Sequence, residues 1–517
     1  MKSLAGILLV VAAGGAWPSL GLAAERLYDV RNYGAAPGGE TLCTAAIQKA
    51  VDQCAAGGGG TVYFPPGAWL SGTIELRSQV TLQLDAGCRL LASSNSADYP
   101  DAVLDARSHK KSSTARALLR GQDIEHVTIR GQGTIDGRGA NAHWKEDKQP
   151  TMVIRLVRCR DVLVEDVSLC NSPTWMQLHR ACERVRIHGI TVNNHVHHGN
   201  DGLDVDDCRD VRVSDCRIDS DDDAICLKST SRRPCENVTI SNCVVSSDSN
   251  AIKAGTDSKG GFRNITIANC TISSPVGTKA FGTVPTALRA IGGRERGLAG
   301  VALELVDGGT LENIAVTNLA IDGVITPIFL RLSNRGWPVR KDMPRAGVGS
   351  FRNVVLSNIV ATHAWKVGCS ISGIAGHPIE NVQLSNIQIT FDGGGTRSES
   401  HVAVREMEES YPECTKFGVL PAYGFFCRHV AGLKLCDVRL RTATPDRRHA
   451  VICEDVKGLV LDGLDVWPAG GAAAAIRLLQ CPGAQIRNSG GIPTDMREAG
   501  KSEDYPGPRW SNTAPAK

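Results

Sequence analysis

A short phrase of residues returns along this 517-residue chain at a nearly constant spacing. Each copy begins with Cys or a large apolar residue, continues through two polar residues and ends in alternating apolar positions. Copies at Cys182, Cys208, Cys235 and Phe262 follow one another at steps of 26, 27 and 27 residues. Alternation with a period of two predicts β-strands, and no helix-length pattern separates the copies.

A unit of this length that holds only short strands is typical of one coil of a parallel β-solenoid. Further copies begin at Leu311, Phe351, Ile379, Val430, Val456 and Cys481. A β-sandwich is the competing all-β architecture, but it would not keep a fixed period over so many coils. The sequence therefore predicts one elongated all-β domain whose apolar positions stack into a continuous core.

A ladder of asparagines supports this register. They recur at one phase of the repeat, and we expect their amides to hydrogen-bond from coil to coil. The ladder consists of Asn242, Asn269, Asn318, Asn358 and Asn386.

The ends of the chain differ from the repeats. Residues 1–24 have a positive start, an apolar run and small residues before residue 25, which predicts a signal peptide and a secreted or periplasmic protein. An uncleaved anchor is the alternative, but the run is shorter than the ~20 residues of a spanning helix. We expect no membrane association after cleavage.

The mature chain divides into a single β-helix domain, residues 25–487, and a polar tail, residues 488–517. The domain begins with a cap at about 25–75, where an amphipathic pattern in 41–55 predicts a helix covering the open end of the stack. A longer step between two repeats predicts an inserted loop at about 395–428, which carries several aromatic residues.

The chain contains 18 cysteines, and most of them fall on repeat phases. Neighbouring coils lie about 4.8 Å apart, which is near disulfide range but poor in direction. Stacked buried thiols are therefore favoured, and the pairs Cys43–Cys54 or Cys414–Cys427, which lie off the ladders, are the better disulfide candidates. Zinc is disfavoured because no Cys-x-x-Cys pair occurs.

Carboxylates concentrate between residues 201 and 223. Three segments align on their apolar positions, beginning at Asp201, Asp223 and Asn250. This alignment places those three residues in one column and Asp204, Cys226 and Lys253 in a second, outward-facing column. Two aspartates one strand spacing apart repel each other, which favours general acid–base chemistry. A calcium site or a solvated acidic face remains an alternative explanation.

The same segments resemble glycoside hydrolase family 28, the polygalacturonase-like enzymes. The resemblance is carried by several short motifs. They are Tyr28-Asp-Val-Arg-Asn-Tyr-Gly, Gly131-Gln-Gly-Thr-Ile-Asp-Gly, Asn171-Ser-Pro-Thr-Trp, Asn200-Asp-Gly-Leu-Asp and Asp222-Asp-Ala-Ile-Cys-Leu-Lys. It implies a right-handed parallel β-helix that hydrolyses galacturonan or rhamnogalacturonan without a metal or other cofactor.

The resemblance also implies roles for single residues. Asp222 would be the general acid that protonates the glycosidic oxygen, and Asp201 and Asp223 would deprotonate the attacking water with inversion at the anomeric carbon. Other side chains near this group are candidate substrate-binding residues. These candidates are Asn200, Asp204, Asn250, Lys253, Lys228 and Arg331.

Three positions depart from the family pattern. Gly199 stands where the family has Asn, and Asn250 stands where it has the His that tunes the acid. The family's short cationic motif, which binds a carboxylate of the substrate, is replaced here by residues 302–304, which end in Glu304. Whether this chain prefers uronate substrates is therefore open. Lys253 is a candidate replacement cation. The group His195, His197 and His198 offers a candidate replacement for the histidine, with a metal-free structural role as the alternative.

Two other functions stay open at this point: a calcium-dependent pectate-lyase-like β-helix enzyme and a non-catalytic carbohydrate-binding β-helix. The formal net charge is +3 and the isoelectric point about 8.1, so no polybasic surface indicates nucleic acid. We expect a monomer whose partner is a pectic polysaccharide or oligosaccharide.

Overall fold

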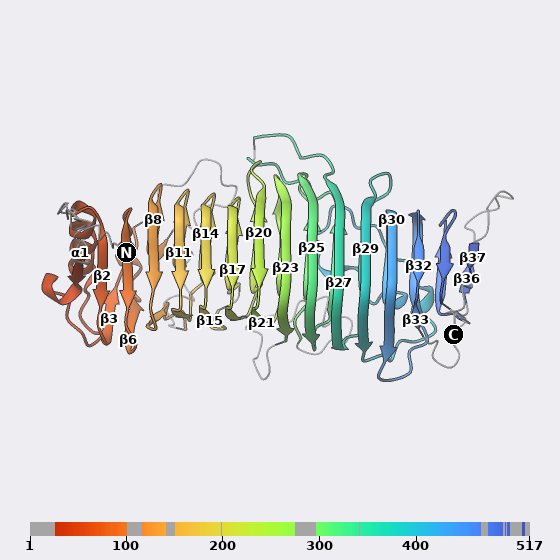
Figure 1. Ribbon diagram of the computed structural model, residues 1–517, viewed down its shortest axis with the longest axis horizontal. Helices are drawn as coiled ribbons and strands as arrows, with labels where there is room; N and C mark the ends of the chain where they lie inside the picture. The colour runs from red at the N-terminus through yellow and green to blue at the C-terminus, as the bar shows by residue number, and fades with distance from the viewer. Residues whose placement is uncertain are drawn as a thin grey trace, which may run out of the picture.

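The chain winds into a long stack of coils with one helix at its N-terminal end (Figure 1). This computed structural model describes residues 26–100, 116–140, 150–197, 199–274, 296–340, 342–466, 474–489, 492, 494–496 and 509–511. The predicted signal peptide lies outside the described residues. The structure is a right-handed parallel β-helix, which confirms the predicted fold class.

The strands form three faces, and all pairings between named strands in the described part of the chain are parallel. The first face carries the candidate site. It consists of β4 (Ile74–Glu75), β7 (Ala117–Gln122), β10 (Met152–Val157), β13 (Gln177–Arg180), β16 (Leu203–Asp206), β19 (Ile225–Ser229), β22 (Asn250–Ser258), β24 (Ala299–Leu305), β26 (Thr326–Leu332), β28 (Cys369–Ser372), β31 (His449–Lys457), β34 (Ile476–Leu479) and β36 (Thr494–Met496).

The second face follows the first along each coil. It consists of β1 (Leu27–Asp29), β2 (Gly60–Phe64), β5 (Val80–Leu84), β8 (Glu125–Arg130), β11 (Arg160–Glu165), β14 (Glu183–His188), β17 (Arg209–Ser214), β20 (Cys235–Ser241), β32 (Val460–Asp462), β35 (Gln485–Arg487) and β37 (Arg509–Ser511).

The third face closes the coil. Its own strands are β3 (Gly67–Ser71), β6 (Cys88–Ala92), β9 (Thr134–Asp136), β12 (Ser168–Cys170), β15 (Thr191–Asn194), β18 (Arg217–Ser220), β21 (Val244–Ser247) and β33 (Asp465–Val466). Five long strands bend from the second face into the third. They are β23 (Gly261–Ser273), β25 (Thr310–Asp322), β27 (Ser350–Ala364), β29 (Ile379–Phe391) and β30 (Ala422–Thr442), and β30 also joins the first face.

The helices are few and peripheral. α1 (Thr44–Ala56) begins three residues later than predicted and packs Ile47, Val51 and Cys54 against the end of the core (Figure 1). Four short 3-10 helices lie in turns and in the insertion. They are η1 (Val30–Tyr33), η2 (Ser96–Asp98), η3 (Glu399–His401) and η4 (Cys414–Phe417). No helix in the described part of the chain has the length and apolar character needed to cross a bilayer.

One apolar column shows how the repeat builds the core. Leu203, Ile225, Ile252, Val301 and Ile328 pair in register from coil to coil, and each is at most 1% exposed. Burial of such a side chain contributes about 1.5–3 kcal/mol relative to exposure. The inward positions taken from the repeat are therefore confirmed.

The asparagine ladder is also confirmed. The amide of Asn269 donates to Asn242 at 3.3 Å, and the contacts from Asn318 and Asn386 to the preceding rungs measure 3.0 and 2.8 Å. These residues adopt positive φ values, a conformation that Asn tolerates better than most residues. A second ladder, which the sequence analysis did not identify, consists of Asn237, Asn264, Asn313, Asn353 and Asn381.

All 18 cysteines are free thiols. The proposed pairs Cys43–Cys54 and Cys414–Cys427 are therefore wrong. The Cys43 thiol instead donates to the carbonyl oxygens of Ala36 and Thr41, at 3.4 and 3.2 Å. On the repeat phases the thiols stack as expected.

Candidate active site

Three consecutive strands of the first face bring the candidate residues together. Asp204 of β16 pairs with Cys226 of β19, and Cys226 pairs with Lys253 of β22. This register confirms the outward column of the sequence alignment. At the turns that precede these strands, the Gly202 amide donates to the Asp223 carbonyl at 2.9 Å, and the Asn250 side chain donates to the Asp223 carboxylate at 2.8 Å.

Asn200 fixes the turn that presents Asp201. Its side-chain amide donates to the carbonyls of Ser172 and Thr174, each at 2.8 Å, and its side-chain oxygen accepts from the amides of Val196 and His197 at 3.0 and 2.6 Å. Asn200 is fully buried. The structure therefore places this candidate substrate-binding residue in a positioning role.

Two buried lysines interleave with the carboxylates. The Lys228 ammonium lies 2.9 Å from Asp204 and 3.4 Å from Asp201, and it sits 4.7 Å from the ring centre of Trp175. The Lys253 ammonium lies 3.1 Å from Asp223. Buried carboxylates rarely persist without such partners, so the two lysines stabilise the ionised state of this group.

Asp222 and Asp223 have their pKa values displaced in opposite directions. Burial raises the pKa of Asp222, and the neighbouring charge of Asp223 acts in the same direction. Burial opposes ionisation of Asp223 as well, but the Lys253 ammonium, followed by that of Lys228, outweighs it and lowers the pKa of Asp223. Neighbouring carboxyls separated in this way suit the roles of acid and base.

The charge of Asp204 also affects the pKa of Asp201. Burial raises the pKa of Asp204 to about 6 against the pull of Lys228. Burial also raises the pKa of Asp201 well above its usual range, and the charges of Asp204 and Asp222 add to the effect. Of the two candidate bases, Asp223 is therefore the one whose ionised form its surroundings favour.

The three candidate catalytic aspartates also differ in how much of their surface is exposed to solvent. Asp201 and Asp223 are 3% and 5% exposed, whereas Asp222 is partly exposed. Hydroxyls of Ser220 and Ser247 donate to the Asp222 carbonyl at 2.8 and 2.7 Å, which fixes the backbone that carries the acid. Of the adjacent pair Asp222 and Asp223, the carboxyl that solvent reaches better is thus the one whose protonated form is favoured.

The departures from the family pattern have local explanations. Gly199 has a φ of +75°, which favours glycine, and its α-carbon faces the Asp222 carboxylate, 4.0 Å from where a β-carbon would lie. Asn250 donates to Asp223 rather than to Asp222. The Asn250 side chain therefore orients the proposed base, Asp223, rather than the proposed acid.

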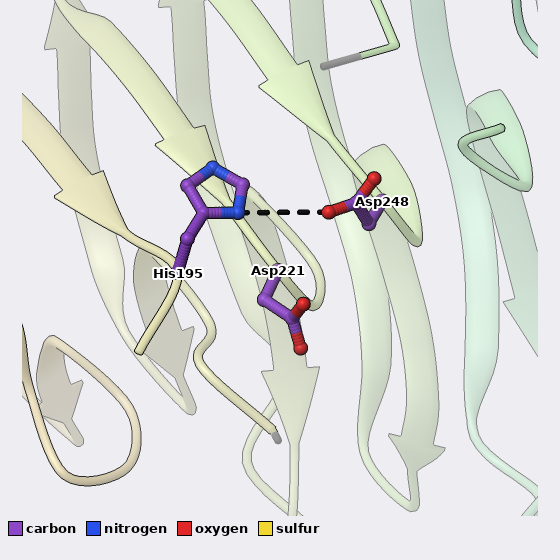
Figure 2. Close-up of side chains that lie close together, drawn as sticks. All are labelled: His195, Asp221 and Asp248. Atoms are coloured by element: carbon purple, nitrogen blue, oxygen red, sulfur yellow. Dashed lines mark ion pairs between the residues drawn. The ribbon is translucent and has the colours of Figure 1, made fainter. Parts of the chain in front are cut away.

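His195 faces a different set of acids (Figure 2). Its Nε2 lies 2.8 Å from Asp219 and its Nδ1 lies 3.5 Å from Asp248. Burial disfavours its charge, but the carboxylates of Asp219 and Asp248, which attract the imidazolium, outweigh burial and raise the pKa of His195 to about 9. His198, another histidine considered beside it, lies outside the described residues.

In the described part of the chain, the ligand atoms of His195, Asp221 and Asp248 lie within 4.8 Å of one another, a spacing that a metal ion could bridge. A protonated imidazole has no lone pair for a metal. The raised pKa of His195 therefore favours its ion pairs with Asp219 and Asp248, which tie the residue after β15 to the next two coils.

Arg331 and Arg335 are buried rather than facing solvent. The Arg331 guanidinium donates to the Ser372 hydroxyl at 2.9 Å and to the Glu406 carbonyl at 2.6 Å. Arg335 forms a close ion pair with Asp307. Arg331 therefore links the first face to the insertion that carries Glu406.

The inserted loop, which carries several aromatic residues, contributes two side chains to this site. Tyr411 and Glu413 reach Lys253, with the Tyr411 hydroxyl 3.5 Å and a Glu413 oxygen 3.8 Å from its ammonium. Glu304 of β24 also approaches this ammonium at 3.8 Å. No local pattern marks Tyr411 or Glu413, because they lie about 160 residues from Lys253 in the sequence.

The structure is thus a parallel β-helix whose first face carries neighbouring carboxyls with pKa values displaced in opposite directions. Residues 66–278 match the model of glycosyl hydrolases family 28. This match confirms the resemblance seen in the sequence.

Two curated relatives and one solved structure illustrate the similarity. A probable polygalacturonase of Vitis vinifera is 33% identical over 215 residues, 38% of this chain and 43% of the relative. A probable rhamnogalacturonase A of Aspergillus oryzae is 27% identical over 210 residues, 41% of each chain. An exopolygalacturonase of Thermotoga maritima shares the fold with a TM-score of 0.58 at 21% identity, covering 71% of this chain and 87% of that one. The chain thus matches less than half the length of these curated relatives.

Proposed function

We propose that this protein is an exported glycoside hydrolase that cleaves α-glycosidic bonds of pectin-type polysaccharides or oligosaccharides by inverting general acid–base catalysis. One observation carries the proposal. Asp222 and Asp223 are adjacent on the same turn, the first partly exposed and the second buried, and the pKa of the first is raised while that of the second is lowered. The match of residues 66–278 to the model of glycosyl hydrolases family 28 supports the same conclusion.

In the proposed reaction, Asp222 donates its proton to the glycosidic oxygen as the bond from the anomeric carbon breaks. A water molecule held between Asp201 and Asp223 forms the new bond on the opposite side of that carbon. Asp223 accepts one proton of this water and later releases it to solvent, and solvent returns a proton to Asp222. Inverting enzymes hold the acid and base about 6.5–9.5 Å apart, which leaves room for this water.

The relatives favour pectic substrates, since they include proteins described as polygalacturonase and as rhamnogalacturonase A. Both galacturonan and rhamnogalacturonan are therefore candidate substrates. The apolar N-terminal run of the sequence supports export. We propose that the mature protein acts as a secreted or periplasmic monomer.

The test is incubation of the full-length protein with pectic polysaccharides, with and without a chelator. New reducing ends without an ultraviolet-absorbing product, unchanged by the chelator, are expected. An absorbing unsaturated product that disappears with the chelator would indicate a lyase instead. Binding without any product would indicate a carbohydrate-binding β-helix. An Asp222→Asn variant is the control for contaminating activity, because it should form no reducing ends.

A further inference from the structure

On the second face, outward side chains form columns that run from coil to coil, along strands that stand side by side in Figure 1. One column alternates between acids and arginines at every step. It consists of Glu125, Arg160, Glu183, Arg209, Glu236, Arg263, Glu312, Arg352 and Glu380. Each charge therefore faces an opposite charge in the next coil, which lowers the electrostatic energy of the stack.

A neighbouring column on the same strands departs from this alternation. Arg186 of β14 pairs in register with Arg212 of β17, and both side chains are exposed. In the described part of the chain, neither guanidinium forms an ion pair or a hydrogen bond. Arg184, by contrast, has the Asp161 carboxylate at 2.6 Å. Adjacent coils lie about 4.8 Å apart, so the two unpaired cations repel each other unless an anion lies between them.

The two arginines line an open groove of about 660 Å³ on this face. Leu163 and Thr239 flank them in the same column, on the preceding and the following coil. Asp210 and Asn237 also line the groove, and the Asn237 amide donates to the Asp210 carboxylate at 2.8 Å. The groove thus combines two cations with an apolar side chain and with neutral and acidic hydrogen-bonding groups, a mixture typical of ligand sites.

We propose that Arg186 and Arg212 form a second, non-catalytic binding site for an acidic polysaccharide, with a uronate carboxylate between the two guanidiniums. Arginine suits this role because its planar guanidinium can donate two parallel hydrogen bonds to a carboxylate. Leu163 would contact the apolar face of the sugar, and Asp210 and Asn237 would bind its hydroxyls. The identity of the polymer rests on the proposed function, since the site would hold the enzyme on its pectic substrate while the first face acts on it.

The balance of charge in the groove favours a polysaccharide over a denser polyanion. The lining side chains include three arginines and two aspartates, and the whole chain has a formal net charge of only +3. A nucleic acid needs many cations along its phosphates. A uronate chain carries at most one carboxylate per sugar and otherwise presents hydroxyls, to which the two aspartates offer acceptors.

The experiment measures binding isotherms of the full-length Asp222→Asn variant on immobilised polygalacturonate, which this variant should not degrade. In this background, the double replacement Arg186→Gln and Arg212→Gln should raise the apparent Kd about three- to tenfold. Binding to a fully methyl-esterified polymer, which lacks carboxylates, should not change. With Asp222 intact, the same double replacement should leave kcat/KM on short pectic oligosaccharides at the native value.

The double replacement Arg217→Gln and Arg439→Gln is the matched control, because it removes two exposed cations from the third face. It should leave every affinity unchanged, and circular dichroism verifies that each variant folds. An unchanged Kd for polygalacturonate in the Arg186 and Arg212 variant, or an equal loss in the control, would overturn the site.

Two further outcomes would also overturn the assignment. One is an equal loss of binding to dextran sulfate or to a nucleic acid in the Arg186 and Arg212 variant, which would reveal a general anion surface. The other is a lack of any binding to polygalacturonate by the Asp222→Asn protein. The reducing-end assay decides independently whether the protein is a hydrolase.

Discussion

Replacing Lys253 with Met tests how the base is kept ionised. The Lys253 ammonium lies 3.1 Å from Asp223, and both side chains are buried. Removing one partner of a buried ion pair typically costs about 3–5 kcal/mol, because the remaining charge is left uncompensated. Asp223 can avoid part of this cost by taking up a proton, and each pH unit of such a displacement corresponds to about 1.36 kcal/mol.

The variant should therefore lose activity at neutral pH and regain part of it in alkali. We expect the acidic limb of its kcat/KM profile against pH to move upward by at least about one pH unit. Lys253→Arg keeps the cation and should restore most of the native profile. The assay is the release of reducing ends from pectic oligosaccharides between pH 3 and pH 9, buffered at about constant ionic strength to limit differences in screening.

Lys259→Met is the matched control. Lys259 is equally buried and lies 2.8 Å from Asp257, so its loss should lower the free energy of unfolding by a similar amount. The acidic and basic limbs of its kcat/KM profile against pH should lie at the same pH values as those of the native protein. A native pH profile for Lys253→Met, or an equal displacement in Lys259→Met, would refute the assignment of Asp223 as the base held by Lys253.

Three further predictions concern the proposed acid, a buried histidine and the cysteines. Asp222→Asn should lower kcat by about 10²–10⁴-fold with little change in the unfolding midpoint, and near-native turnover would exclude it as the acid. His179 of β13 is buried, and burial lowers its pKa to about 4. The folded protein therefore holds His179 neutral, and the free energy of unfolding should fall as the pH drops from about 6.5 toward 4. Denaturant titrations should show the native protein losing up to about 3 kcal/mol relative to His179→Gln across that range, and parallel curves would contradict this. Thiol titration in denaturant without reductant should find all 18 cysteines reactive, and a lower count would reveal disulfides absent from the structure.

The coils and the arrangement of the acids could be predicted because they depend on local spacing. The repeat period fixes which residues of adjacent coils pair, so Asp204, Cys226 and Lys253 fall into one column in the sequence and in the structure alike. The asparagine ladder has the same origin. In a parallel β-helix, the strand register follows directly from the period.

The insertion could not be placed in this way. Its residues have no periodic partner, and its contacts with the first face depend on where a long loop folds back. The pairing of Glu413 with Lys253 and the burial of Arg331 under Glu406 both arise from that packing. From the sequence, Arg331 is a candidate substrate-binding residue, because the sequence does not reveal the protein groups that already bind its guanidinium.

The most direct test of the central claim compares two leaving groups in two variants. The substrates are a pectic oligosaccharide and the same oligosaccharide carrying a nitrophenyl group, which departs without protonation, at its reducing end. Asp222→Asn should be inactive on the first and recover to within about tenfold of the native rate on the second, whereas Asp223→Asn should stay inactive on both. If Asp222→Asn lost the same factor on both substrates, or if Asp223→Asn were the variant rescued, the division into an acid and a base proposed here would be contradicted.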